Sequence, residues 1–401
     1  MSCNQTMTVL QSRRARRWGA TCLCLLLTLP VTAMAAHPGL TRCEPEDCGL
    51  SPERLAVIDE VVEEGLRNER MPGCVVLVGY RGSIAWLKSY GSRQVQPDVV
   101  PMSTDTVFDL ASLTKPIATA TSVMLLIEDG LVELDAPAVK YLPEFGVNGK
   151  DVITIRQLLI HQSGLLPDNS IKDYEDGRVE SFRRIHELDL RAEPGTRFMY
   201  SDVGFIVLGE IVERVSGKSL DAFANERIFK PLGMSETGFN PGSELKSRAA
   251  PTQQRDGGWM RGEVHDPRAW KMDGIAGHAG LFSTAEDLAR YAQMLLNNGT
   301  LGEQRILKSE TCQLMQSSQP VTGGIRTLGW DRRTGYSSNR GDLFSPNAFG
   351  HGGFTGTALW IDPDQELFVI FLSNRVHPDG QGSVNALAGR IGTIAAAAIK
   401  E

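Results

Sequence analysis

Residues 108–119 read FDLASLTKPIAT, which places the hydroxyl of Ser112 three residues before the amine of Lys115. On a helix, residues three apart share one face, so these two side chains are expected to lie side by side. An amine activates a neighbouring hydroxyl when burial or a nearby cation lowers its pKa. Pro116 fits the first turn of a helix, where its missing N–H removes little. The stretch therefore places a hydroxyl that an amine could activate at the start of a helix, and a plain surface pair is the alternative.

Two further motifs follow this one along the chain. A single Ser-x-x-Lys carries little information, because average composition predicts about one such match in a chain of this length. Tyr200 is followed by Ser201 and Asp202, and His351 is followed by two glycines just before an apolar run. Three motifs in this order are much less accidental than one.

Apolar, strand-like runs lie at both ends of the chain. Residues 74–80 and 83–90 are separated by an Arg-Gly pair and predict a hairpin. Residues 357–361 and 367–372 flank a turn and predict a second pair of strands, and an Ala-rich helical stretch follows over 384–399. We therefore expect an antiparallel sheet built from both chain ends.

The pattern between these strands is mostly helical. Helices are predicted over residues 117–129, 154–160, 204–215, 220–229 and 285–297. A helical lobe over about 116–270 would then interrupt the sheet, which makes the fold a mixed α/β (α+β) class. Residues 240–275 and 320–350 are rich in Gly, Arg, Asp and Ser without periodicity, and predict long surface loops that frame a binding cleft.

The N-terminus is typical of a secretory signal peptide over residues 1–35. A basic region with four arginines precedes an apolar run over 19–29, and Ala33-Met34-Ala35 supplies a cleavage site. The run is about half of the ~20 residues that cross a bilayer, so no transmembrane anchor is expected after cleavage. We expect a periplasmic or extracellular protein, with the export route open.

Charge and cysteine content limit the partners. The chain carries 41 Lys and Arg against 48 Asp and Glu, and removal of the signal makes it more acidic, which argues against nucleic acid. Cys43 and Cys48 could close a small loop, and Cys74 lies in an apolar strand pattern typical of an inert core residue. No second ligand pair at zinc spacing is present, so neither a metal nor an organic cofactor is expected.

Together the motifs resemble the serine β-lactamase and penicillin-binding protein superfamily, in particular its class C-like branch of DD-peptidases, carboxylesterases and cell-wall amidases. The resemblance spans residues 51–400. It implies a β-lactamase-like hydrolase domain over 51–401, preceded by an N-terminal segment over 36–50. The supporting stretches are Phe108–Thr119, Ile155–Leu165, Pro194–Asp202, Gly277–Leu288 and Gly350–Asp362.

The resemblance also implies roles for individual residues. Ser112 would be the nucleophile that forms an acyl-enzyme, Lys115 its activating partner and Tyr200 a shared proton carrier. The backbone N–H groups of Ser112 and Phe354 would form the oxyanion hole. Gly353 and the glycine before it would let the strand backbone approach closely.

Two positions depart from the family pattern. His351 stands where the family often has Lys, and Asp202 stands where β-lactamases usually have Asn. A histidine with a pKa of about 6.5 is mostly neutral at neutral pH, and Asp202 adds a negative charge, so esters, amides or peptides fit at least as well as penicillins. Alternatively, Asp202 pairs with Lys115 and holds it charged, which would make Tyr200 the main base.

Other candidates have structural and functional interpretations. His161, in the His-Gln-Ser-Gly-Leu turn, is expected to be structural. His278 lies in a segment that lines the cleft in relatives, so substrate contact and loop support are both open. The pair His265-Asp266 belongs with an aromatic loop containing Trp259 and Trp270, which could form a cleft wall or be a plain surface loop. Trp360 alternates as a core residue would.

The expected reaction is acyl-enzyme hydrolysis of cell-wall peptide amide bonds, as in a DD-carboxypeptidase. The substrate would be a small molecule or derived from bacterial peptidoglycan. Alternatives within the enzyme class are N-acetylmuramoyl-L-alanine amidase, carboxylesterase and β-lactamase. A penicillin-binding sensor without turnover is the alternative from another class.

Overall fold

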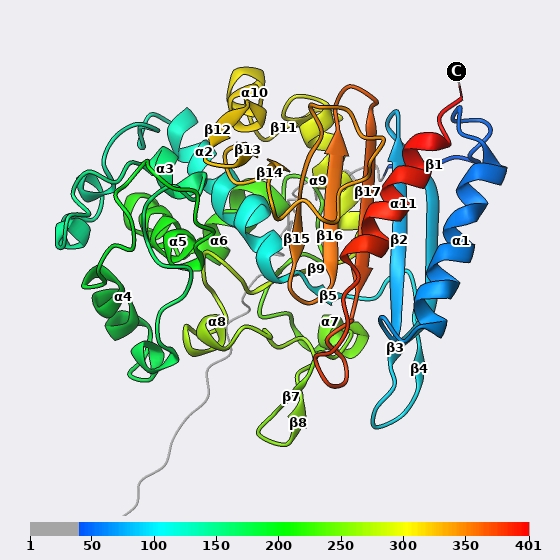
Figure 1. The fold of residues 1–401 in the computed structure, drawn as a ribbon, viewed down its shortest axis with the longest axis horizontal. Helices are drawn as coiled ribbons and strands as arrows, with labels where there is room; N and C mark the ends of the chain where they lie inside the picture. Colours follow the sequence, from blue (N-terminus) through cyan, green and yellow to red (C-terminus); the bar gives the residue numbers. More distant parts are fainter. Residues whose placement is uncertain (1–39, 401) are drawn as a thin grey trace, which may run out of the picture. The chain divides into compact units, whose positions relative to one another are not determined.

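The computed structural model describes residues 40–400 (Figure 1). The predicted signal peptide and its three cysteines lie outside the described residues. Within the described range, every helix is too short or too polar to cross a membrane. A disulfide joins Cys43 to Cys48, as the spacing suggested, while Cys74 and Cys312 are buried free thiols.

A ten-stranded sheet forms the centre of the fold and combines both chain ends, as predicted. In spatial order its strands are β1 (Thr41–Arg42), β3 (Ser83–Gln94), β2 (Gly73–Tyr80), β17 (Leu367–Ser373), β16 (Thr357–Asp362), β15 (Phe349–Gly353), β14 (Asp331–Arg333), β13 (Gly324–Arg326) and β12 (Gln319–Val321), and β4 (Val100–Pro101) also pairs with β3. All pairs are antiparallel except β1 with β3, so the sheet is mixed at that edge. In the β2–β3 hairpin Arg81 and Gly82 both have positive φ, which suits a two-residue turn.

One sequence prediction about the sheet is wrong in part. Residues 320–350 were expected to form a surface loop, yet they contain most of β12 and all of β13 and β14. These strands are three residues long and largely polar, so they leave no alternating apolar pattern for the sequence to reveal. The longest irregular stretch in this range runs from 334 to 348.

Helices cover both faces of the sheet. Their bounds are α1 (Pro52–Arg67), α2 (Thr121–Glu128), α3 (Ile155–Leu159), α4 (Arg178–His186), α5 (Asp202–Ser216), α6 (Leu220–Ala224), α7 (Ser243–Arg248), α8 (Pro267–Lys271), α9 (Ala285–Leu296), α10 (Ser309–Gln316) and α11 (Asn385–Ala397). Alternate residues of β2 face opposite sides, because strand side chains alternate. Val76 and Val78 join the core beneath α1 and α11, whereas Val75 and Leu77 join the larger core shared with α9 and the lobe.

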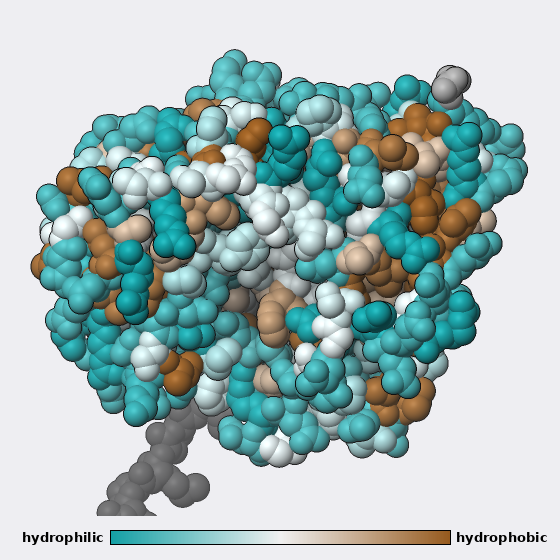
Figure 2. All heavy atoms as spheres, viewed as in Figure 1, coloured by the Kyte–Doolittle hydropathy of each residue, from teal (hydrophilic) through white to brown (hydrophobic). Residues whose placement is uncertain are grey.

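The helical lobe lies beside the β15 end of the sheet (Figure 1). The predicted helices are present, and Trp360 and Cys74 are core residues as expected. A small three-stranded sheet of β5 (Phe108–Asp109), β9 (Leu281–Ser283) and β6 (Gly238–Phe239) leads the chain into the first motif. The surface is hollowed near the centre of the face shown in Figure 2, between the lobe and the main sheet.

Candidate active site

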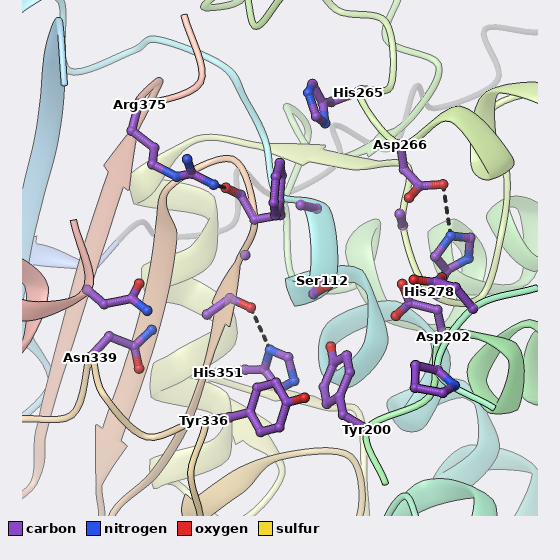
Figure 3. Close-up of a pocket in the computed structure, with 18 of the residues that line it drawn as sticks. Ser112, Tyr200, Asp202, His265, Asp266, His278, Tyr336, Asn339, His351 and Arg375 are labelled. Atoms are coloured by element: carbon purple, nitrogen blue, oxygen red, sulfur yellow. Dashed lines mark hydrogen bonds and ion pairs between the residues drawn. The ribbon is translucent and has the colours of Figure 1, made fainter. Parts of the chain in front are cut away.

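A cavity of about 680 Å³ brings the three motifs together. It is lined by Ser112, by Tyr200 and Asp202 from the lobe, and by His351 to Phe354 from β15 and the turn after it (Figure 3). Both predicted loops contribute to its rim. Residues 240–275 supply His265, Asp266 and Pro267, and residues 320–350 supply Asp331, Tyr336 and Asn339.

Ser112 lies in a short 3-10 turn, η1 (Ala111–Leu113), which continues into the π-helical turn η2 (Lys115–Ala120) and then α2. Lys115 is fully buried, and its Nζ donates to Ser112 Oγ at 3.0 Å and to the backbone oxygen of His278 at 3.1 Å. The hydroxyl and the amine therefore lie side by side, as the three-residue spacing predicted.

The Lys115 Nζ also lies 2.6 Å from Asp202 Oδ1. Burial lowers the pKa of the lysine, but the charge and hydrogen bond of Asp202, together with the contacts of Tyr200, outweigh burial and hold that pKa above its usual value. Lys115 is therefore charged at neutral pH. This geometry is the one expected if Asp202 pairs with Lys115 and orients it.

Tyr200 faces the same hydroxyl, with its phenol end directed toward Ser112 (Figure 3). Its ring is stacked between His161, at a centroid distance of 4.3 Å, and Tyr336, at 4.8 Å. Burial raises the pKa of Tyr200, and the charge of Lys115 opposes that rise only in part. The phenol is therefore protonated at rest and held rigidly by stacking.

The β15 end of the sheet approaches the Ser112 turn very closely. Thr357 Oγ1 donates to the backbone oxygen of Leu110 at 3.1 Å. A Cβ at Gly353 would lie 2.2 Å from Thr357 Oγ1 and 2.4 Å from the Leu110 oxygen, so glycine is required there. Phe354 follows at the cavity mouth with its side chain 60% exposed.

Both motif histidines are neutral. Burial, together with the charges of Arg326 and Lys115, holds the pKa of His351 and of His161 well below 6.5. His351 Nδ1 lies 2.7 Å from the Gly352 oxygen, so that nitrogen carries the proton. His161 Nδ1 accepts the N–H of Ser201 at 3.0 Å, which fits the structural role expected of it.

His278 lines the cavity but is 1% exposed, and its Nε2 lies 3.0 Å from Asp266 Oδ1. Through its backbone oxygen it also holds Lys115. Its contacts thus support the loop and the lysine, and its place at the cavity wall leaves substrate contact open. Of the predicted cleft wall, His265 and Asp266 line the cavity, whereas Trp259 and Trp270 do not.

Two side-chain groups among the described residues could hold a metal ion, and in each of them a lysine or an arginine already pairs with at least one carboxylate. They are Glu144 with His186 and Glu210, and Asp202 with Asp266 and His278. Arg214 lies 2.5 Å from Glu144 and 3.9 Å from Glu210, and Lys115 pairs with Asp202. A metal ion would have to compete with these ammonium and guanidinium groups.

Sequence reasoning missed several cavity residues. Tyr336, Asn339 and Arg375 reach the cavity from segments without a motif, and Asp109 lies behind it. Arg375 donates to the backbone oxygens of Phe354 and Gly382, and it has no carboxylate partner among the residues described. Only Asp109 carried a signal, because it stands three residues before Ser112.

Comparison with known proteins identifies the family. The chain matches the Beta-lactamase family over residues 58–392. It is 34% identical over 370 residues to an "N-acetylmuramyl-L-alanine amidase" of Bacillus subtilis (strain 168), covering 83% of each chain. It is 32% identical over 394 residues to a "Putative D-alanyl-D-alanine carboxypeptidase" of Escherichia coli (strain K12), covering 88% of this chain and 90% of that one.

A solved class C beta-lactamase has the same fold. Its TM-score is 0.71 at 17% sequence identity, covering 88% of this chain and 98% of that one. At this identity the likeness concerns the fold alone, while the family match and the two relatives span most of the sequence. The chain therefore belongs to the Beta-lactamase family of serine hydrolases.

Proposed function

We propose that this hydrolase cleaves amide bonds of cell-wall peptides through a Ser112 acyl-enzyme, in the manner of a D-alanyl-D-alanine carboxypeptidase. The observation that carries the proposal is the Ser112 hydroxyl held by Lys115 at 3.0 Å in the cavity that Tyr200 also lines. The 32% identical relative supports the substrate class. We place the activity outside the cytoplasm on the strength of the predicted signal peptide.

The proton route follows from the charges of the site. Lys115 is charged and cannot accept the serine proton, so the Tyr200 oxygen takes it while the phenol proton passes to the leaving nitrogen. The Ser112 Oγ–H bond and the scissile C–N bond break, and an acyl–Oγ bond and a new N–H bond form. The Lys115 ammonium stabilises negative charge developing on the tyrosine oxygen. Water then attacks the acyl-enzyme by the reverse relay.

The backbone N–H groups of Ser112 and Phe354 supply the oxyanion hole in this proposal. Contacts between the β15 end of the sheet and the Ser112 turn hold these two segments together before substrate binds. Fixed donors of this kind contribute more than mobile ones, because they need no reorganisation during the reaction.

Arg375 favours a carboxypeptidase over the other hydrolases. The neutral His351 provides no cation for a substrate carboxylate, whereas Arg375, which has no acidic partner within residues 40–400, brings a guanidinium to the same cavity. A peptide with a free C-terminal carboxylate is therefore expected to react faster than its C-terminal amide. The variant Arg375→Gln should remove that preference.

The amidase is the second candidate, because the 34% identical relative has that name.

The test is intact mass after brief exposure to a fluorescent penicillin, with Ser112→Ala as control, followed by assays on a peptide ending in D-Ala-D-Ala and on muropeptides. A Ser112-dependent adduct with release of D-alanine supports the proposal. Cleavage of muropeptides between sugar and peptide without D-alanine release would assign the amidase, and hydrolysis of short acyl esters alone would assign an esterase. A single stoichiometric adduct without turnover would identify a sensor.

A further inference from the structure

A buried carboxylate, Asp109, lies directly behind the Ser112 turn. It is 3% exposed, and its two oxygens accept from two different parts of the chain. Oδ1 accepts the N–H of Ala111 at 2.8 Å, and Oδ2 accepts the N–H of His265 at 2.7 Å. The backbone oxygen of Asp109 in turn accepts from Thr355 Oγ1 at 2.7 Å.

The first of these contacts holds an unusual backbone conformation. Ala111, the residue immediately before Ser112, has φ of 46°. Residues other than glycine rarely occupy this region, because the Cβ crowds the backbone, and they persist there only when the surrounding structure holds them. The bond from the Ala111 N–H to Asp109 fixes the turn in the conformation that presents Ser112 to the cavity.

The second contact completes a ring of hydrogen-bonded residues that begins and ends at the Ser112 turn. The N–H of His265 binds Asp109, and the next residue, Asp266, binds His278 Nε2 at 3.0 Å. The backbone oxygen of His278 accepts from Lys115, and Lys115 donates to Ser112. Asp109 thus joins the serine turn to the loop whose contacts hold the lysine.

We propose that Asp109 is a positioning residue for the acylation step, which holds the Ser112 turn and the His265–Asp266 wall in one fixed arrangement. The inference rests on the proposed function, since it assigns a role relative to the Ser112 nucleophile. A carboxylate is needed because each of its oxygens accepts one N–H. An asparagine in the same place keeps one acceptor and directs its own N–H group toward the second donor.

The chain provides a matched control in Asp287 on α9. It is 5% exposed, and its Oδ2 accepts the N–H of Glu236 and the hydroxyl of Thr237, both at 2.8 Å. Burial raises the pKa of Asp109 and of Asp287 alike, each to about 6. Asp287 does not line the cavity, so Asp287→Asn reports what the loss of such a buried carboxylate does to the fold alone.

The experiment measures how fast a fluorophosphonate probe labels Ser112 in the wild type, Asp109→Asn and Asp287→Asn, together with the melting temperature of each. Misplacement of a nucleophile by about 1 Å costs up to about a hundredfold in rate, so labelling of Asp109→Asn should fall by about tenfold to a hundredfold. Asp287→Asn should label like the wild type. Adding Ala111→Gly to Asp109→Asn should restore part of the rate, because glycine adopts positive φ without strain.

The pH profile separates positioning from a general loss of structure. The wild-type labelling rate should decline as the pH falls through about 6, where Asp109 gains a proton, and Asp109→Asn should lack this limb. The charged and titratable neighbours that face Asp109 are Asp266, Arg255 and His265, and burial lowers the pKa of His265 below its usual value.

Equal labelling of Asp109→Asn and the wild type at all pH values would overturn the inference. If Asp109→Asn does not fold, the pH profiles of the wild type and of Asp287→Asn decide. The inference would then be overturned if neither protein shows a fall in labelling rate as the pH drops through about 6. Failure of the wild type to label any more than Ser112→Ala would instead refute the proposed function.

Discussion

Replacing Asp202 with asparagine tests whether this carboxylate holds Lys115 charged. The variant keeps the shape of the side chain but removes the negative charge 2.6 Å from a fully buried ammonium. An unpaired buried charge typically destabilises a protein by about 3 to 5 kcal/mol. We therefore expect Asp202→Asn to lower the free energy of unfolding substantially at neutral pH.

The pH dependence sets the size of this effect. The lysine can always escape the penalty by losing its proton, which costs about 1.4 kcal/mol for each pH unit below its unfolded pKa of about 10.5. Deprotonation thus limits the penalty of the unpaired charge to about 5 kcal/mol at pH 7 and about 2 kcal/mol at pH 9. In the wild type the raised pKa of Lys115 stabilises the fold at all pH values below about 10.

Thermal unfolding of both proteins at pH 7 and pH 9 measures the difference. At about 2 °C per kcal/mol, the gap in melting temperature should shrink from about 10 °C at pH 7 to about 4 °C at pH 9. Glu133→Gln is the control, since Glu133 pairs with Lys140 at the same 2.6 Å but with both side chains exposed. It should leave the melting temperature nearly unchanged at either pH, because exposed ion pairs contribute little to stability. A gap for Asp202→Asn that does not change with pH would refute the assignment of a charged lysine held by Asp202.

Three further outcomes are expected. Tyr200→Phe should lower the rate of acylation by about a hundredfold or more while the melting temperature changes little, because the stacked ring remains and only the proton relay is lost. Gly353→Ala should abolish acylation by forcing the strand away from the Ser112 turn, whereas Gly335→Ala, where a Cβ meets nothing within 4 Å, should be silent in the same assay. Because the pKa of Asp287 rises from 3.8 to about 6 on folding, its stabilising contribution is full below pH 4 and is lost as the pH rises through 6. Chemical denaturation should therefore show that the free energy of unfolding of Asp287→Asn, relative to that of the wild type, rises by on the order of 3 kcal/mol between pH 4 and pH 7.

Long apolar strands and the residues of short motifs could be predicted from the sequence. The runs that became β2, β16 and β17 are mostly apolar, and every residue in these three strands is buried, so the sequence predicted them as core strands. The meeting of Ser112 with Lys115 followed from helical spacing alone. Bringing Tyr200 and His351 to the same place required the family resemblance, since no local pattern encodes a contact across the lobe.

The rest of the site depends on loops and on tertiary contacts. Tyr336 and Arg375 reach the cavity because the sheet and the irregular stretch around 334–348 place them there, and nothing in their own sequence shows it. The bond that Asp109 accepts from the His265 N–H is equally invisible, because that donor lies 156 residues away along the chain. The short strands β12 to β14 were missed for want of an apolar pattern.

The assembly of the sheet has a consequence for how the protein acquires activity. The bond between Thr357 and Leu110 joins residues 247 positions apart, and β17 lies between β16 and β2 at the centre of the sheet. Contacts between residues this far apart in the chain form late and slowly, because a long loop must first close at a cost in conformational entropy. A nascent chain in which Ser112 and Lys115 have already been synthesised is thus still inactive. A polypeptide that ends before β17 leaves β2 and β16 with unpaired strand edges, which promote aggregation. The protein therefore gains hydrolase activity when β17 completes the sheet, and not when the motif of Ser112 and Lys115 is synthesised.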